Sequence, residues 1–255
     1  MAGQGFHYAL LKMIEKEAGF ETSNEMLVGT LCMDSLNAIA GNRRRTHFTG
    51  GAGCVLPKLE ELRFTVGAGC VLPKLEELRE FSTMQSWDSG YMKTYITDPF
   101  IDLQLFESAS QHLPEDAYKN GIRIHLIADA TYDDFIATKV FDLSKQAQGI
   151  IVERENGTVM DGATFRKHIY RLYPMMDQYL MKKAGITAED VENVKQVLKQ
   201  YMNADAAAFI GKYLNFNEEL VWNDSSIFKK ADIDKMSEEI VAIACEYMMA
   251  MKDEI

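Results

Sequence analysis

Apolar residues recur at helical spacing over much of the chain. The pattern is clear in residues 6–19, in residues 24–40, at about 187–202 and in the Met-rich segment 232–253. Residues 120–135, NGIRIHLIADATYDDF, have the composition of a buried helix. Strand signals are confined to residues 140–143 and 149–159, and the second segment contains an Asn-Gly pair that would close a hairpin. We therefore predict an all-α fold, a multi-helix bundle with at most one small β-hairpin.

Local signals mark one helix start and one repeated segment. Thr187 followed by Asp190 is typical of an N-cap with an acid at the third helical position. Residues 48–63 and 64–79 are copies of one 16-residue sequence that differ only at Gly50 and Val66. Two units are too few for a solenoid, so we interpret them as a natural or engineered tandem duplication within a single domain spanning residues 1–255. Each copy predicts an amphipathic helix in LPKLEELR, with its proline near the first turn.

Composition narrows the class of protein. The chain has 255 residues, of which 47% are hydrophobic and 25% charged, and this balance is typical of a soluble globular protein. A net charge of −11 argues against a nucleic-acid partner, because such proteins present a basic surface to the phosphates. No apolar run is long enough for a transmembrane segment, and no signal peptide is visible. The four cysteines form no CxxC pair, so a cytoplasmic location is expected.

The residues with the most informative spacing are His125 and Asp129. They stand four positions apart in an apolar segment, which places both side chains on one helical face. Imidazole and carboxylate at this spacing can hold a divalent ion together, or they can form a simple hydrogen bond. Burial of Asp129 among isoleucines without a cation or several donors would cost several kcal/mol, which favours a metal. Asp133 and Asp134 are expected at the solvated end of the same helix.

Other candidate ligands lie in separate helical segments. Asp34 is near the centre of the apolar segment 24–40, and His7 lies in the first predicted helix. His168 also lies within a helical pattern, whereas His112 precedes a proline and is predicted in a surface loop. Inward-facing histidines and carboxylates from separate helices are how a bundle forms a metal site in its core.

Taken in chain order, these residues resemble the motifs of the zinc-dependent phospholipase C family, which includes nuclease-like all-α metallohydrolases with multinuclear zinc sites. The similarity spans about residues 5–175 in sparse motifs, of which GIRIHLIAD is the most specific. The family has a further His after this motif and a Glu four residues after the last His. This chain has Asp133, Asp134 and Leu172 there, so two zinc ions are expected rather than three. The resemblance implies metal ligands at His7, Asp34, His47, His125, Asp129 and His168.

The resemblance implies a metal-dependent hydrolase that attacks a phosphoester with metal-activated water. Asp34 or Asp129 would then bridge or orient the hydroxide as catalytic carboxylates. Arg43, Arg44 and Arg45 would bind substrate phosphate, although a solvated loop explains this basic run equally well. The expected substrate is a phosphomonoester, a phosphodiester or a phospholipid head group. The alternative is a non-enzymatic helical binding or assembly protein with structural histidines, whose Met-rich segments would be core or adaptable interfaces.

Overall fold

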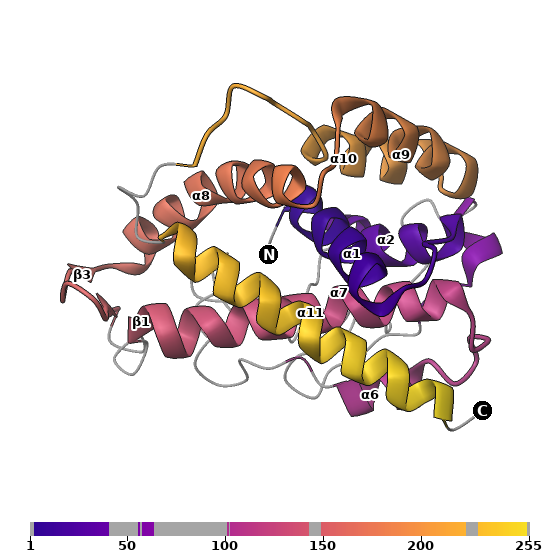
Figure 1. Ribbon diagram of the computed structural model, residues 1–255, viewed down its shortest axis with the longest axis horizontal. Helices are drawn as coiled ribbons and strands as arrows, with labels where there is room; N and C mark the ends of the chain where they lie inside the picture. Colours follow the sequence, from indigo (N-terminus) through magenta and orange to yellow (C-terminus); the bar gives the residue numbers. More distant parts are fainter. Residues whose placement is uncertain are drawn as a thin grey trace, which may run out of the picture.

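The protein is a bundle of α-helices with one small antiparallel sheet, as the sequence predicts (Figure 1). The computed structural model describes residues 3–40, 58–63, 103–142, 149–222 and 229–253, together with Leu56 and Ile101. The elements in this part of the chain are α1 (Gln4–Ala18), α2 (Asn24–Ala40), the 3₁₀ turn η1 (Leu59–Arg63), α6 (Leu103–Ala109), α7 (Ala117–Phe135), the π turn η2 (Ile136–Val140), β1 (Phe141–Asp142), β2 (Ile151–Glu153), β3 (Val159–Met160), α8 (Gly162–Lys183), α9 (Ala188–Tyr201), α10 (Ala204–Tyr213) and α11 (Lys230–Asp253).

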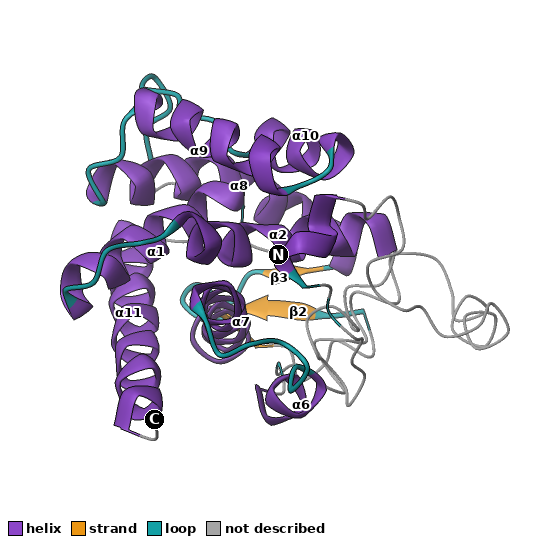
Figure 2. Ribbon diagram, turned by 90° about the vertical axis from the view of Figure 1, so that its right-hand side faces the viewer, coloured by secondary structure: helices purple, strands orange, loops and turns teal. Residues whose placement is uncertain are grey.

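Helix α7 is the central element of the bundle. Figure 2 shows it end-on, with α1 and α2 above it, α6 below it and α11 alongside. Of its 19 residues, 14 are buried, so it exposes little of its surface to water. A helix that is buried on most sides must find a partner for each polar side chain it carries. The predicted buried helix in residues 120–135 is thus confirmed, and its histidine and carboxylates lie inside the molecule.

Helices α2 and α7 pack against each other more extensively than any other described pair, and their backbones approach closely at two glycines. A Cβ atom on Gly29 would lie 2.1 Å from the carbonyl oxygen of Tyr118. A Cβ atom on Gly121 would likewise lie 2.1 Å from the carbonyl oxygen of Met26. Both contacts are far inside van der Waals distance, so only glycine fits on either side of the crossing. Thr30 Oγ1 adds hydrogen bonds of 3.0 Å to Met26 O and 3.2 Å to Gly121 O.

The helix starts follow local capping chemistry. The side chains of Asp116, Asp161 and Asn203 accept hydrogen bonds from the backbone N–H groups of the first turns of α7, α8 and α10. Thr187 and Asp190 form the predicted reciprocal capping box at α9. These caps satisfy donors that a helix cannot pair internally. Of the four, the start of α9 is the one that the sequence predicts.

The β element contains the predicted hairpin and one further strand. Strands β2 and β3 pair antiparallel with Ile151 opposite Met160, and β1 extends the sheet by pairing Phe141 with Glu153. The turn between β2 and β3 includes Gly157, whose N–H donates to Glu153 O at 2.9 Å. The short sheet follows the C-terminal end of α7, whereas α6 lies towards the other end of this helix (Figure 1).

A buried ion network ties α6, α7 and α11 together. Arg123 is 1% exposed and donates to both carboxylate oxygens of Glu107 at 2.6 and 2.7 Å. Lys119, also buried, lies 3.5 Å from Glu107 and pairs with Glu115. Tyr247 of α11 donates to Glu107 at 2.9 Å. Burial alone would raise the pKa of the Glu107 carboxyl, but the bonds and charge of Arg123 bring this pKa below its ordinary value.

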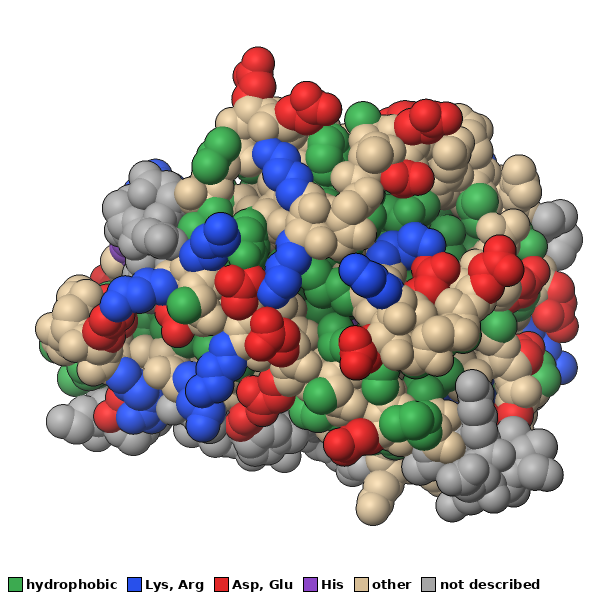
Figure 3. All heavy atoms as spheres, viewed as in Figure 1, with side chains coloured by type: hydrophobic (Ala, Val, Ile, Leu, Met, Phe, Trp, Pro, Cys, Tyr) green, Lys and Arg blue, Asp and Glu red, His purple; other side chains and the backbone are tan. Residues whose placement is uncertain are grey.

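The described surface is that of a protein with mixed charges. Acidic and basic side chains are interspersed over the face that Figure 3 shows. None of the helices that the structure describes is long and apolar enough to cross a membrane. Most of the duplicated segment 48–79 lies outside the described residues, and the five residues of η1 form a 3₁₀ turn in the first copy of LPKLEELR.

Candidate metal centre

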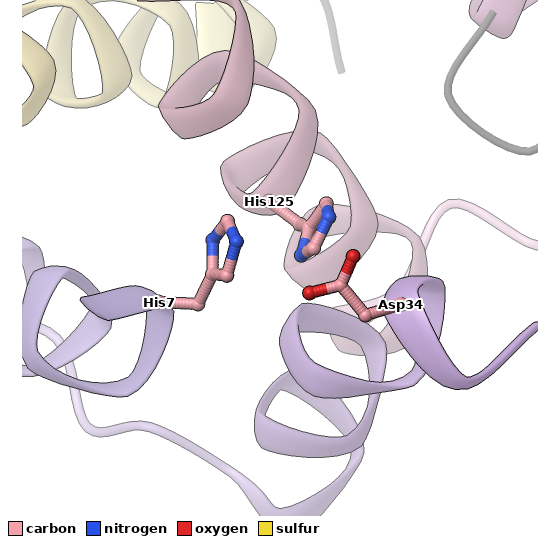
Figure 4. A group of neighbouring side chains, drawn as sticks. All are labelled: His7, Asp34 and His125. Carbon is pink, nitrogen blue, oxygen red and sulfur yellow. The ribbon is translucent and has the colours of Figure 1, made fainter. Parts of the chain in front are cut away.

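Three predicted ligands from three helices meet at the centre of the bundle. His7 comes from α1, Asp34 from α2 and His125 from α7 (Figure 4). One ligand atom from each lies within 4.8 Å of the others. All three residues are at most 1% exposed. The sequence candidates therefore converge in the way that a core metal site requires, although they are far apart along the chain.

His125 is held in one orientation by the neighbouring helix. Its Nδ1 lies 2.8 Å from the backbone carbonyl oxygen of Thr30. A carbonyl can only accept a hydrogen bond, so Nδ1 carries the hydrogen, and in the neutral ring Nε2 keeps its lone pair for a ligand. The bond reaches across the crossing of α2 and α7, and it depends on the close approach at Gly29 and Gly121. Such a partner on the second ring nitrogen is typical of metal-ligating histidines.

Asp129 lies beside both histidines. Its Oδ1 is 3.4 Å from His7 Nε2, and its Oδ2 is 3.7 Å from His125 Nε2. The two imidazole rings stack with centroids 3.9 Å apart and planes inclined by 19°. The Asp129 carboxylate thus faces the Nε2 atoms of both histidines. A cation bound to these atoms could take the place of a proton.

The polar atoms of this cluster indicate what is needed to complete it. Gln4 Nε2 donates to Asp34 Oδ2 at 2.8 Å and so orients this carboxylate. His7 is different, because neither of its ring nitrogens has a hydrogen-bond partner among the described residues. A buried polar group without a partner costs about 1–3 kcal/mol. Two imidazoles and the Asp34 carboxylate, with Asp129 beside both rings, are donors suited to zinc and related divalent ions, so the residues present fit such an ion.

Asp177, a buried carboxylate of α8 beside the start of α1, is not among the candidates predicted from the sequence. It accepts hydrogen bonds of 3.2 Å from the backbone N–H groups of Gly5 and Phe6. Burial raises the pKa of the Asp177 carboxyl from 3.8 to about 7, against the opposing effect of these donors and of His7, while the charge of Asp34 raises it further. A signal was present in the sequence, since apolar residues occupy the positions one helical turn before and after Asp177.

Two expectations about which helical residues face the core are wrong. Asp133 is buried, at 4% exposure, because α7 remains inside the molecule for a further turn beyond Asp129. His168 is exposed on α8, and the structure does not bring it to the cluster. The apolar face of α8 carries Phe165, Ile169 and Leu172, and His168 lies at the edge of that face, where a small rotation of the helix decides its exposure.

The remaining candidate residues are either exposed or outside the described part of the chain. His112 is exposed, as expected, with its ring nitrogens 3.1 Å from Ala109 O and 2.8 Å from Leu56 O. The described residues do not include the expected ligand His47 or the expected substrate-binding residues Arg43, Arg44 and Arg45.

No protein-family model, curated protein or solved structure matches the chain. The resemblance to zinc-dependent phospholipases C thus stays a prediction from motifs. The case for a function rests on the chemistry of the His7, Asp34, His125 and Asp129 cluster.

Proposed function

We propose that the protein is a metal-dependent hydrolase that acts on a phosphoester, with a divalent ion held at the centre of the bundle. His7, Asp34 and His125 would be ligands, and Asp129 would complete the set. One observation carries the proposal: buried imidazoles and a carboxylate from three different helices lie within 4.8 Å of one another. Zinc is the first candidate because it favours nitrogen and oxygen ligands of this kind.

The chain's own residues supply a defined environment for such chemistry. A bound zinc ion would lower the pKa of a water ligand and polarise a phosphoryl oxygen. Thr30 holds His125 with Nε2 available as a ligand, and Gln4 holds one oxygen of Asp34. Asp129, placed between the two histidines, is the candidate for orienting the attacking water or bridging two ions. The low dielectric of the buried cluster strengthens each of these charge interactions.

The expected second zinc ion and the substrate contacts involve further residues. His47 is the sequence candidate for an additional ligand. Arg43, Arg44 and Arg45 follow the α2 segment that carries Asp34, and they are candidates for binding the phosphate. A phosphomonoester, a phosphodiester and a phospholipid head group all present the same chemistry to this site.

A second candidate has its own support. The near-complete burial of all three side chains is also typical of an ion that stabilises the fold without meeting a substrate. In this case the protein would be a helical binding or assembly module with structural histidines. Metal binding is common to both candidates, so turnover of substrate must separate them.

The test compares His125→Ala with His168→Ala, because His168 is an exposed histidine outside the cluster. Metal content would be measured by elemental mass spectrometry. Hydrolysis of p-nitrophenyl phosphate, of bis(p-nitrophenyl) phosphate and of phosphatidylcholine vesicles would be followed in parallel. We expect metal and hydrolysis in the wild type and in His168→Ala, and loss of both in His125→Ala. Asp34→Asn, which keeps the shape of the side chain, provides a second variant if His125→Ala fails to fold.

The outcomes are distinct. A folded wild-type protein that takes up no divalent ion when zinc is supplied contradicts any metal function. Stoichiometric zinc without turnover of any of the three substrates supports the structural ion instead. Activity on vesicles alone would identify a lipid head group as the substrate, whereas activity on the soluble esters alone would identify a soluble substrate.

A further inference from the structure

Helix α1 is capped by a residue from another helix. Its N-cap position is Gly3, which has no side chain to accept a hydrogen bond. The N–H groups of Gly5 and Phe6 instead donate to Oδ2 and Oδ1 of Asp177, both at 3.2 Å. Asp177 is 5% exposed and lies on α8, 171 positions beyond Phe6 in the chain. One carboxylate thus does for α1 what a local Ser or Asp does at most helix starts.

The first turn of α1 is shaped to receive this carboxylate. A Cβ atom on Gly3 would lie 2.0 Å from Asp177 Oδ2, and one on Gly5 would lie 2.8 Å from Asp177 Cβ. A side chain at Gly3 would displace the Asp177 carboxylate from the N–H groups, and one at Gly5 would press on Cβ of Asp177 and so on α8. The glycines are therefore the sequence counterpart of the capping carboxylate, and the packing of α1 on α8 is closest where Gly5 lies.

The same turn supplies two side chains to the metal cluster. Gln4 donates to Asp34 at 2.8 Å. His7 stacks on His125 and lies 3.4 Å from Asp129. Residues at the start of a helix fray when their N–H groups have no partner, and fraying of this turn would move both side chains.

We propose that Asp177 is a positioning residue of the metal site, which holds the first turn of α1 so that Gln4 and His7 face Asp34 and His125. It acts through the backbone of α1 and not as a ligand. The inference rests on the proposed function only where it concerns metal affinity. The effect of Asp177 on the position of His7 holds in the metal-free protein as well.

The experiment replaces the distant cap by a local one. Asp177→Ala removes the acceptor, and Gly3→Ser in the same chain places a hydroxyl at the N-cap, where it can accept from the N–H of Phe6. The space for the serine is the space that the carboxylate leaves. Zinc affinity would be measured by competition with a chromogenic chelator. The ring signals of ¹³C-labelled histidine would be recorded by NMR in metal-free protein, with the His7 signal assigned from His7→Ala.

We expect Asp177→Ala to lower zinc affinity about 10–100-fold, the usual effect of losing a residue that orients a ligand. We also expect it to shift the His7 ring signals, and the double variant Asp177→Ala/Gly3→Ser to restore both. Gly3→Ser alone should impair both, because the new side chain meets Asp177. Thr187→Ala is the matched control, since it removes the N-cap of α9, and it should leave zinc affinity and the His7 signals unchanged.

Three results would overturn the inference. The first is an unmoved His7 signal in Asp177→Ala. The second is a double variant that regains thermal stability but not zinc affinity, because Asp177 would then act by charge or by ligation. The third is a Thr187→Ala variant that loses zinc affinity to the same extent as Asp177→Ala. A wild type that binds no zinc refutes the proposed function, while the NMR comparison still decides whether Asp177 positions His7.

Discussion

Substitution of Gly121 by alanine tests how the α2–α7 crossing holds the cluster together. The new Cβ would lie 2.1 Å from Met26 O, 2.8 Å from Thr30 N and 3.0 Å from Gly29 Cα. All three atoms belong to the backbone, so no side chain can rotate away to relieve the contact. The shortest distance must lengthen to about 3.4 Å, which requires the two helices to separate.

The expected cost follows from what the separation disrupts. Overpacking of a close contact typically costs about 1–3 kcal/mol. Movement of Thr30 O away from His125 Nδ1, now 2.8 Å apart, leaves a buried donor without its acceptor at about 1–3 kcal/mol. The better helix propensity of alanine offsets about 1 kcal/mol. We therefore expect Gly121→Ala to lower the free energy of unfolding by about 1–5 kcal/mol and to weaken zinc binding.

The assay is urea denaturation followed by far-UV circular dichroism, in the presence of a chelator. Gly211→Ala is the matched control, because a Cβ on Gly211 of α10 would meet, among the described residues, Lys195 Cγ alone, at 3.9 Å. This change should raise stability by about 0.5–1 kcal/mol through helix propensity alone. If Gly121→Ala is as stable as the wild type, or if both substitutions shift stability in the same direction, the close crossing does not hold the helices as described.

Three further predictions concern other parts of the molecule. Thr187→Ala should lower the free energy of unfolding by about 1 kcal/mol through loss of the α9 cap, and an unchanged urea midpoint would contradict this. Arg123→Met should cost at most about 3–5 kcal/mol, because the half-buried Glu107 loses its two bonds to the guanidinium and keeps Lys119 and Tyr247 as partners. Lys229→Met, which removes an exposed pair, should cost less than about 1 kcal/mol in the same assay. Asp177, with its pKa raised to about 7, binds a proton in the folded protein that the unfolded chain releases above about pH 4. The stability of the metal-free wild type relative to Asp177→Asn should therefore be greatest below about pH 4 and fall by at most ~4 kcal/mol as the pH rises through 7. A difference that is flat or rises between about pH 4 and 7 would refute this sign.

Local chemistry explains which features could be predicted. The periodic segments at 6–19, 24–40 and 232–253 correspond to α1, α2 and α11, because the spacing of apolar residues depends only on the geometry of one helix. The Thr187–Asp190 cap and the Asn-Gly hairpin are equally local. The pairing of His125 with Asp129 also follows from four-residue spacing on one helix.

Rotation of a helix about its own axis was harder to predict. His168 and Asp177 both lie in the helical pattern of α8, yet the first is exposed and the second is buried. The apolar residues of α8 define a broad stripe, and its edges are assigned to core or solvent only by the helices that pack there. Burial of Asp133 has the same origin, since α7 stays inside the molecule to its last turn, where Tyr132 and Phe135 are buried as well.

The sequence by itself thus determined the all-α class, most of the described helices and the chemical types that could bind a metal. Only the tertiary structure decided that His7, Asp34 and His125 meet, because their convergence depends on the distance between α2 and α7 at Gly29 and Gly121. It also decided that Asp177 caps α1 from a helix far along the chain. Contacts of this kind join segments that carry no local signal for each other, since the free energy that selects them comes from packing the whole core.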